Sequence, residues 1–200
     1  MLRLFVSDSA KQEMIRTYII EDYKDLYPEL KSSALTDRIS LDILKEEGIE
    51  DPEIHRTENG KPYEARRRIF FSISHSGRFF SCAVCEYQVG IDIQTRGPED
   101  PEKIAERFFT EEEKDYIRSA DGDIAAPFLR IWTRKEALIK FRGSTLAEVV
   151  SSTSVLSVDD VDFIDLELEN GTIGCLCIPA GQEEDVRIIR RKAIRGQDGC

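Results

Sequence analysis

Runs of residues with the two-residue period of a β-strand recur along this chain, and they limit it to folds that contain β-sheet. Between Ile69 and Ser74, for example, positions 69, 71 and 73 share one face and positions 70, 72 and 74 share the other. Successive side chains of a strand point to opposite faces, so each run can bury one side of a sheet. The sequence predicts strands at residues 69–74, 78–85, 89–94, 162–169, 172–178 and 186–189.

Stretches with the spacing of an amphipathic helix separate these strands. Apolar positions three and four residues apart predict helix within residues 10–48, and again from 104 to 118 and from 124 to 141. Helices therefore precede strands in both halves of the chain, with a break near Gly97-Pro98. This order of elements predicts an α+β fold made of two similar subdomains packed together, residues 1–97 and 98–200.

The composition fits a globular protein and excludes several classes. With 200 residues, 40% of them hydrophobic, the chain can bury a core of its own. No apolar run approaches the roughly 18–20 residues that cross a bilayer, and Asp8 interrupts any signal-peptide core. We therefore expect a cytoplasmic protein that binds no membrane. The formal charge of −11 argues against binding to nucleic acid.

Two close pairs of cysteines, Cys82 with Cys85 and Cys175 with Cys177, suggest a zinc site as an alternative. Both pairs lie in strand-like runs, and residues three apart on a strand point to opposite faces. Cys82 and Cys85 are therefore poorly placed to share one metal ion. We expect no zinc, and instead small buried side chains in a reducing compartment.

The chemistry-bearing residues are concentrated in a few short segments. Asp92 and Gln94 share one face of a predicted strand, which places two oxygen-bearing side chains side by side. Glu136 and Lys140 are four apart on a predicted helix and also share a face. Carboxylates suit Mg²⁺ and an ammonium suits a phosphate group. The segments are Gly60-Lys61-Pro62, residues 71–77 (FSISHSG), residues 90–94 (GIDIQ), Arg107-Phe108-Phe109 and residues 132–140 (WTRKEALIK).

Together these segments resemble the two-lobed, surfactin-synthetase-activating type of 4'-phosphopantetheinyl transferase. That family has a G-(I/V)-D strand followed some forty residues later by W-x-x-K-E-A/S-x-x-K, and here Asp92 precedes Glu136 by 44 positions. The resemblance implies transfer of the phosphopantetheine arm of coenzyme A to a serine of an acyl or peptidyl carrier protein. It also implies a pseudo-two-fold arrangement of the subdomains, an active site between them, and a monomer as the active form.

The resemblance further implies roles for individual residues. Mg²⁺ is expected on Asp92 and Glu136, with Gln94 beside them in a position where bacterial relatives often have Glu. Glu136 is the candidate base for the carrier serine, and Lys140 is expected to steady the leaving pyrophosphate. The residues expected to contact coenzyme A are Lys61, Ser74, His75, Lys135 and Lys140.

Several of these residues also have plain structural interpretations. Thr133 and Glu136 have the spacing of a helix capping box, as do Thr110 and Glu113. Glu136 and Lys140 could form a solvated ion pair. Phe108 and Phe109 fit core packing as well as they fit the pantetheine tunnel and carrier-docking surface implied by the family.

Basic clusters stand out in this acidic chain, although each could be an ordinary solvated face. The carrier's docking helix is expected from the resemblance to be acidic, so it should meet one of them. The clusters are Arg66-Arg67-Arg68; Arg134, Lys135, Lys140 and Arg142; and Arg187, Arg190, Arg191, Lys192 and Arg195.

Two other functions remain open from the residues alone. One is a regulatory protein that binds coenzyme A without catalysis, but the intact spacing of Lys135, Glu136 and Lys140 speaks against it. The other is a magnesium-dependent phosphohydrolase, for which the sequence shows no residue that would position an attacking water.

Overall fold

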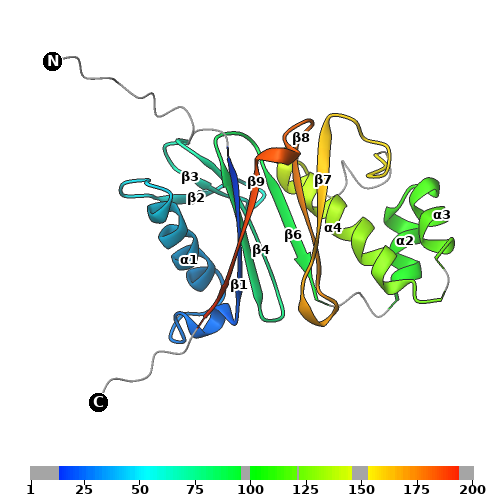
Figure 1. Cartoon of the computed structure of the whole chain (residues 1–200), viewed down its shortest axis with the longest axis horizontal. Coiled ribbons are helices and arrows are strands. Elements are labelled where there is room, and N and C mark those ends of the chain that lie inside the picture. Colours follow the sequence, from blue (N-terminus) through cyan, green and yellow to red (C-terminus); the bar gives the residue numbers. More distant parts are fainter. Residues whose placement is uncertain (1–13, 96–99, 121, 146–152, 194–200) are drawn as a thin grey trace.

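Figure 1 shows a computed structural model of the chain, which describes residues 14–95, 100–120, 122–145 and 153–193. It confirms a mixed α+β structure. The helices are α1 (Ser32–Glu46), α2 (Pro101–Phe108), α3 (Glu111–Arg118) and α4 (Ala125–Arg142). The strands are β1 (Ile15–Glu21), β2 (Ile54–Arg56), β3 (Pro62–Glu64), β4 (Phe70–Ser76), β5 (Phe79–Cys85), β6 (Gly90–Gln94), β7 (Val161–Glu167), β8 (Ile173–Pro179) and β9 (Val186–Lys192).

The strands form two main sheets and a small hairpin. One sheet has the order β4-β5-β1-β9, the other has the order β6-β8-β7, and β2 pairs with β3. Neighbouring strands are antiparallel, except that β9 runs parallel to β1. The chain thus returns at its end to the sheet in which its first described strand lies. Residues 97 and 98, where the sequence suggests a boundary between subdomains, lie outside the described residues.

The two sheets pack against each other, and helices cover their outer faces (Figure 1). Between the sheets lies a core that includes Ile19 from β1, Ile91 and Ile93 from β6, and Leu176 from β8. Helix α1 covers the outer face of the four-stranded sheet. The three other helices cover the outer face of the three-stranded sheet. The layers are therefore helix, sheet, sheet and helices.

Helix α4 packs directly on β6 because Gly90 has no side chain. A Cβ atom at Gly90 would lie 1.9 Å from the carbonyl oxygen of Ala137 and 2.6 Å from the amide nitrogen of Phe141. Both are backbone atoms, so no side-chain rotation could make room. The glycine that opens the GIDIQ segment therefore sets the distance between α4 and β6.

The expectation of helix throughout residues 10–48 is wrong between Ile15 and Glu21, where the structure has β1. Helix α1 confirms the later part of that expectation. β1 lies between β5 and β9 and is buried on both faces, so apolar residues do not alternate along it. A short apolar run of this kind also matches the spacing of a buried helix. Its strand character comes from its pairing partners.

The four cysteines within the described residues are buried and free, and each lies on a strand. Cys82 packs in the cluster that faces α1, and Cys85 packs in the core between the sheets. Cys175 and Cys177 face the helices on the other side of the molecule. Burial raises the pKa of the Cys85 thiol to about 11. Within the ranges that the structure describes, no helix combines the length and apolar character needed to span a membrane.

Candidate active site

Hydroxyl groups on one face of β4 join the two sheets. Serines occupy positions 72, 74 and 76 of β4, and each Oγ accepts a hydrogen bond from a backbone amide of β6 or of Thr95, the residue after β6. Because β4 and β6 are edge strands of different sheets, these hydroxyls satisfy amides that no neighbouring strand pairs. The pairs are Ser72 with Ile91 at 3.1 Å, Ser74 with Ile93 at 3.2 Å and Ser76 with Thr95 at 2.9 Å.

Asp92 lies at this junction and is only 3% exposed. Its Oδ1 atom accepts hydrogen bonds from Ser74 Oγ at 2.7 Å and from Lys140 Nζ at 2.8 Å. Its Oδ2 atom accepts a longer bond from Gln94 Nε2 at 3.3 Å. The shared face of Asp92 and Gln94 is thus confirmed. The carboxylate is held by neighbours from three elements.

Lys140 reaches the junction from α4. Its ammonium donates to the carbonyl oxygen of Ile91 at 2.9 Å as well as to Asp92. The ion pair of Lys140 is therefore with Asp92, which lies on another element. The capping-box interpretation of Thr133 and Glu136 is wrong, because both residues lie inside α4 and the Thr133 hydroxyl donates to Arg130 O at 3.2 Å.

Glu136 lies one helical turn before Lys140, and its side chain is half-buried. Burial raises the pKa of this carboxyl group, the negative charge of Asp92 raises it further, and Lys140 lowers it. Within the described residues, Glu136 accepts no hydrogen bond from another side chain or amide. A carboxylate that has no hydrogen-bond partner among the described residues and lies close to a second carboxylate suits a bound cation.

The donor set matches Mg²⁺ better than a transition metal. The described part of the chain holds no cluster of three or more His, Cys, Asp or Glu side chains around a common position. Mg²⁺ commonly takes one or two carboxylates from the protein and fills its remaining positions with phosphate oxygens and water. Asp92 and Glu136 meet that requirement.

Lys61 and His75 lie close to Lys140. The Lys61 ammonium donates to the carbonyl oxygen of Lys140, and its pKa is lowered by burial and by the charge of Lys140. The two lysines line a cavity of about 250 Å³ together with Ser72 and residues at the end of α4. Partial desolvation, then the charges of Lys140 and Lys24, lower the pKa of His75, while Asp92 raises it. β4 continues through Ser76, so the strand expected to end at residue 74 also includes His75.

Lys135 does not reach this site, so its expected contact with coenzyme A is wrong. The side chains of Lys135 and Glu113 are both 0% exposed and form an ion pair of 2.9 Å. Lys135 also donates to Thr153 O at 3.1 Å, and its ammonium lies 5.7 Å from the centre of the Phe109 ring. Burial lowers the pKa of Lys135, and the charge of Glu113 opposes that shift. The neighbour of Glu136 is a structural residue.

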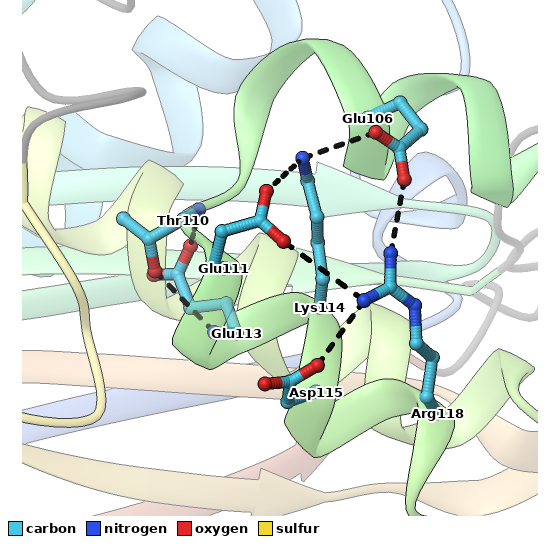
Figure 2. A network of polar contacts seen from close by, with 7 residues as sticks. All are labelled: Glu106, Thr110, Glu111, Glu113, Lys114, Asp115 and Arg118. Atoms are coloured by element: carbon cyan, nitrogen blue, oxygen red, sulfur yellow. Dashed lines mark hydrogen bonds and ion pairs between the residues drawn. The ribbon is translucent and has the colours of Figure 1, made fainter.

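The capping box of Thr110 and Glu113 is confirmed, as Figure 2 shows. Thr110 N donates to Glu113 Oε2 at 2.8 Å, and Glu113 N donates to Thr110 Oγ1 at 3.3 Å. In the same view, Lys114 and Arg118 both contact Glu106, which ties α3 to α2. The corner between these helices is thereby fixed.

Core packing explains Phe109, and in part Phe108. Phe109 is 4% exposed and stacks on Phe128 with the ring centres 5.2 Å apart. Phe108 is only partly buried and meets the edge of Trp132, with 6.4 Å between ring centres. The contact of Phe109 with Lys135 therefore links the Arg107-Phe108-Phe109 segment to the WTRKEALIK segment through the core.

Most cations of the basic clusters have partners inside the protein. Within the described residues, Arg67 and, on β9, Arg187 and Arg190 are exposed and have no carboxylate partner. Arg195 lies outside those residues. The paired cations are Arg66 with Glu53, Arg68 with Glu64, Arg134 with Asp165, Arg142 with Asp160, Arg191 with Glu46 and Lys192 with Glu21.

A buried aspartate paired with a lysine, a half-buried glutamate and a second lysine thus meet where two sheets and a helix join. This site suits the binding of a divalent cation and phosphate groups. The chain belongs to the 4'-phosphopantetheinyl transferase superfamily, whose family model matches residues 88–189. That match begins just before β6 and includes Asp92, Gln94, Glu136 and Lys140.

Individual relatives agree with the family match. A 4'-phosphopantetheinyl transferase of Bacillus subtilis is 35% identical over 133 residues, which cover 66% of this chain and 58% of that protein. The 4'-phosphopantetheinyl transferase gsp of Aneurinibacillus migulanus is 32% identical over 150 residues, 74% of this chain and 62% of that protein. The chain thus spans about three fifths of the length of these relatives.

Proposed function

We propose that this chain transfers the 4'-phosphopantetheine group of coenzyme A to a serine hydroxyl of an acyl or peptidyl carrier protein. The observation that carries the proposal is the meeting of Asp92, Glu136 and Lys140 at the junction of β6 and α4. These three residues come from the two segments that define the family pattern. The family match and the names of the relatives support the same reaction.

We assign Mg²⁺ to Asp92 and Glu136, with Gln94 beside them. Once bound, this ion neutralises negative charge on the pyrophosphate oxygens of coenzyme A. Lys140 and Lys61 add positive charge from the protein, and they line one cavity. His75 is assigned to the phosphate on the ribose of coenzyme A.

The carrier protein supplies the nucleophile, and Glu136 is the group that can take its proton. The serine oxygen forms a bond to the phosphorus that carries the pantetheine arm, and the bond from that phosphorus to the nucleotide bisphosphate breaks. The serine proton passes to Glu136 directly or through water. Lys140 steadies the leaving group.

We also propose that two halves related by a pseudo-two-fold axis surround the site in a single chain. Support comes from the layers, since α1 covers one sheet and α4 covers the other. In space, however, each half takes a strand from across the suggested boundary. β6 pairs with β8, and β9 pairs with β1.

Incubation with fluorescent coenzyme A and a panel of apo carrier proteins tests the reaction. A fluorescent carrier, formed in a Mg²⁺-dependent manner and lost when its acceptor serine becomes alanine, is the expected result. Binding of coenzyme A without any labelled carrier would favour the regulatory protein. Release of nucleotide bisphosphate in the absence of carrier would favour the phosphohydrolase. Either of those outcomes would overturn the proposal.

A further inference from the structure

The hydroxyls of Ser72, Ser74 and Ser76 each accept a hydrogen bond from a backbone amide in β6 or directly after it, but one of the three hydroxyls also makes a second contact. Ser74 Oγ also lies 2.7 Å from Asp92 Oδ1. The donors are equivalent backbone amides of Ile91, Ile93 and Thr95, at 2.9 to 3.2 Å from the three hydroxyls. Ser74 is therefore the member of this row that joins the contact between the sheets to the candidate metal site.

We propose that Ser74 is a positioning residue, which orients the carboxylate of Asp92 for metal binding. This inference rests on the proposed function and deepens it. It differs from the role that resemblance suggests for Ser74, which is contact with coenzyme A. Ser74 is only 8% exposed, and its hydroxyl already has two partners inside the protein.

The direction of the hydrogen bond follows from the number of protons available. A serine hydroxyl has one proton to donate and two lone pairs to accept with. The amide of Ile93 can only donate, so it occupies a lone pair of Ser74 Oγ. The carboxylate of Asp92 can only accept, so the hydroxyl proton must point to Oδ1. The amide in β6 thus fixes the direction in which Ser74 donates.

This arrangement makes the two oxygens of Asp92 unequal. Oδ1 is held by Ser74 at 2.7 Å and Lys140 at 2.8 Å, whereas Oδ2 has the longer contact with Gln94 at 3.3 Å. Oδ2 is the oxygen that can turn toward a cation with the smaller loss of protein contacts. Fixing Oδ1 orients the carboxylate before the ion arrives, which lowers the cost of binding.

The row of serines provides its own control. Ser72→Ala removes a hydrogen bond to β6 that is equivalent to the one that Ser74 accepts, but Ser72 Oγ makes no hydrogen bond with Asp92. Any change in metal affinity that comes from loosening the sheets should therefore be similar in Ser72→Ala and Ser74→Ala. Only Ser74→Ala should also lose the hydrogen bond that orients the carboxylate of Asp92.

Calorimetric titration of the full chain with Mg²⁺, without coenzyme A, tests the inference. Ser74→Ala should weaken Mg²⁺ binding by about tenfold, as is typical when a residue that orients a metal ligand is removed. Ser72→Ala should stay within about twofold of the unsubstituted chain. Thermal unfolding of both variants shows whether they are folded. If Ser74→Ala does not fold, Ser74→Cys keeps the approximate volume with a much weaker donor and should also lose affinity.

Equal Mg²⁺ affinities for the Ser72 and Ser74 variants would overturn the inference and leave Ser74 as a link between the sheets only. Unchanged affinity in Ser74→Cys would do the same. Asp92→Asn, titrated in parallel, separates this failure from failure of the proposed function. If Asp92→Asn binds Mg²⁺ like the unsubstituted chain, the metal assignment itself is wrong.

Discussion

The ammonium of Lys140 lies 2.8 Å from Asp92 Oδ1, although the two residues are 48 positions apart. The contact crosses from α4 to β6, and a further bond to the carbonyl oxygen of Ile91 holds the lysine in place. Lys140 thus places a positive charge against the carboxylate of Asp92. The contact requires α4 to lie directly on β6, which Gly90 allows.

Gly90→Ala should lower both stability and activity. The added Cβ would lie 1.9 Å from Ala137 O, so α4 must move away from β6. We expect a loss of about 1–3 kcal/mol in the free energy of unfolding, as for other overpacked cores. Transfer should fall by much more than the folded fraction does, because Lys140 and Glu136 move away from Asp92. Chemical denaturation and a transfer assay measure the two effects.

A second substitution checks the cause. Ala137→Gly removes only a side chain and leaves the backbone carbonyl oxygen of residue 137 in place. Adding it to Gly90→Ala should therefore not restore stability or transfer. Wild-type stability and turnover in Gly90→Ala would show that α4 can shift without consequence.

Asp92→Asn and Glu136→Gln should each lower transfer by about 100-fold or more, because each removes a charge assigned to the metal. Asp92 is almost buried, so the amide, which keeps the shape of the side chain, is a safer test than alanine. Turnover at limiting Mg²⁺ is the measurement. Asp160→Asn, at a solvent-facing acid paired with Arg142, is the matched control and should keep full activity. Near-normal turnover in either site variant would refute the metal assignment.

Lys135→Met should destabilise the fold strongly. It leaves Glu113 as a charge without its cation in a fully buried position, which typically costs about 3–5 kcal/mol. Adding Glu113→Gln should recover part of that loss: it removes the remaining charge, but it leaves one acceptor oxygen for the two backbone amides that Glu113 binds. Thermal and chemical unfolding measure both variants.

Lys103→Met, at a lysine that is 84% exposed, is the control and should leave the unfolding transition nearly unchanged. A stable Lys135→Met variant that binds coenzyme A weakly would instead favour the phosphate contact that the structure contradicts.

The local spacing of apolar and polar residues predicted most of the helices and strands. The strands expected at residues 162–169 and 172–178 are β7 and β8, which pair as a hairpin with a turn at Glu169–Gly171, in which Asn170 has φ 58 and Gly171 has φ 70. The helix expected from 124 is α4. β1 could not be predicted, because its strand character depends on β5 and on β9, which joins it from the other end of the chain.

The sequence indicated which residues belong to the candidate site better than it indicated which of those residues contact each other. The two-residue period of a β-strand was enough to place Asp92 and Gln94 on one face, because both belong to the same strand. The burial of Lys135 depends on Glu113 in another helix, and no pattern local to either residue shows that pairing. The contact of Ser74 with Asp92 depends on how two sheets pack. The sequence signal for this contact is the alternation of serines at positions 72, 74 and 76.

Gln94→Glu should strengthen Mg²⁺ binding in the absence of coenzyme A. Gln94 lies 3.3 Å from Asp92 Oδ2, so the new carboxylate would add negative charge beside Asp92 and Glu136. The unsubstituted chain should bind Mg²⁺ weakly alone and more tightly with coenzyme A, whose pyrophosphate supplies further anionic ligands. Calorimetry of both proteins, each with and without coenzyme A, measures this. Equal affinity in all four titrations would place Gln94 outside the metal site.

Coenzyme A binding should draw a proton onto His75. In the free protein, partial desolvation and the charges of Lys140 and Lys24 lower the pKa of His75, so near pH 6.5 the ring is mostly neutral. A phosphate group beside the ring favours the protonated form and raises that pKa again. Binding should therefore take up protons near pH 6.5 and strengthen as the pH falls toward the pKa of the free protein.

Calorimetry in buffers of different ionisation enthalpy measures the number of protons taken up. His75→Gln should remove the uptake, and so should dephospho-coenzyme A, which lacks the phosphate on the ribose. His55→Gln is the matched control, because His55 lies on β2 beside Glu53 and should leave the uptake intact. If His75→Gln and the unsubstituted chain take up protons equally, the phosphate is bound elsewhere, and the lowered pKa of His75 reflects only its neighbours.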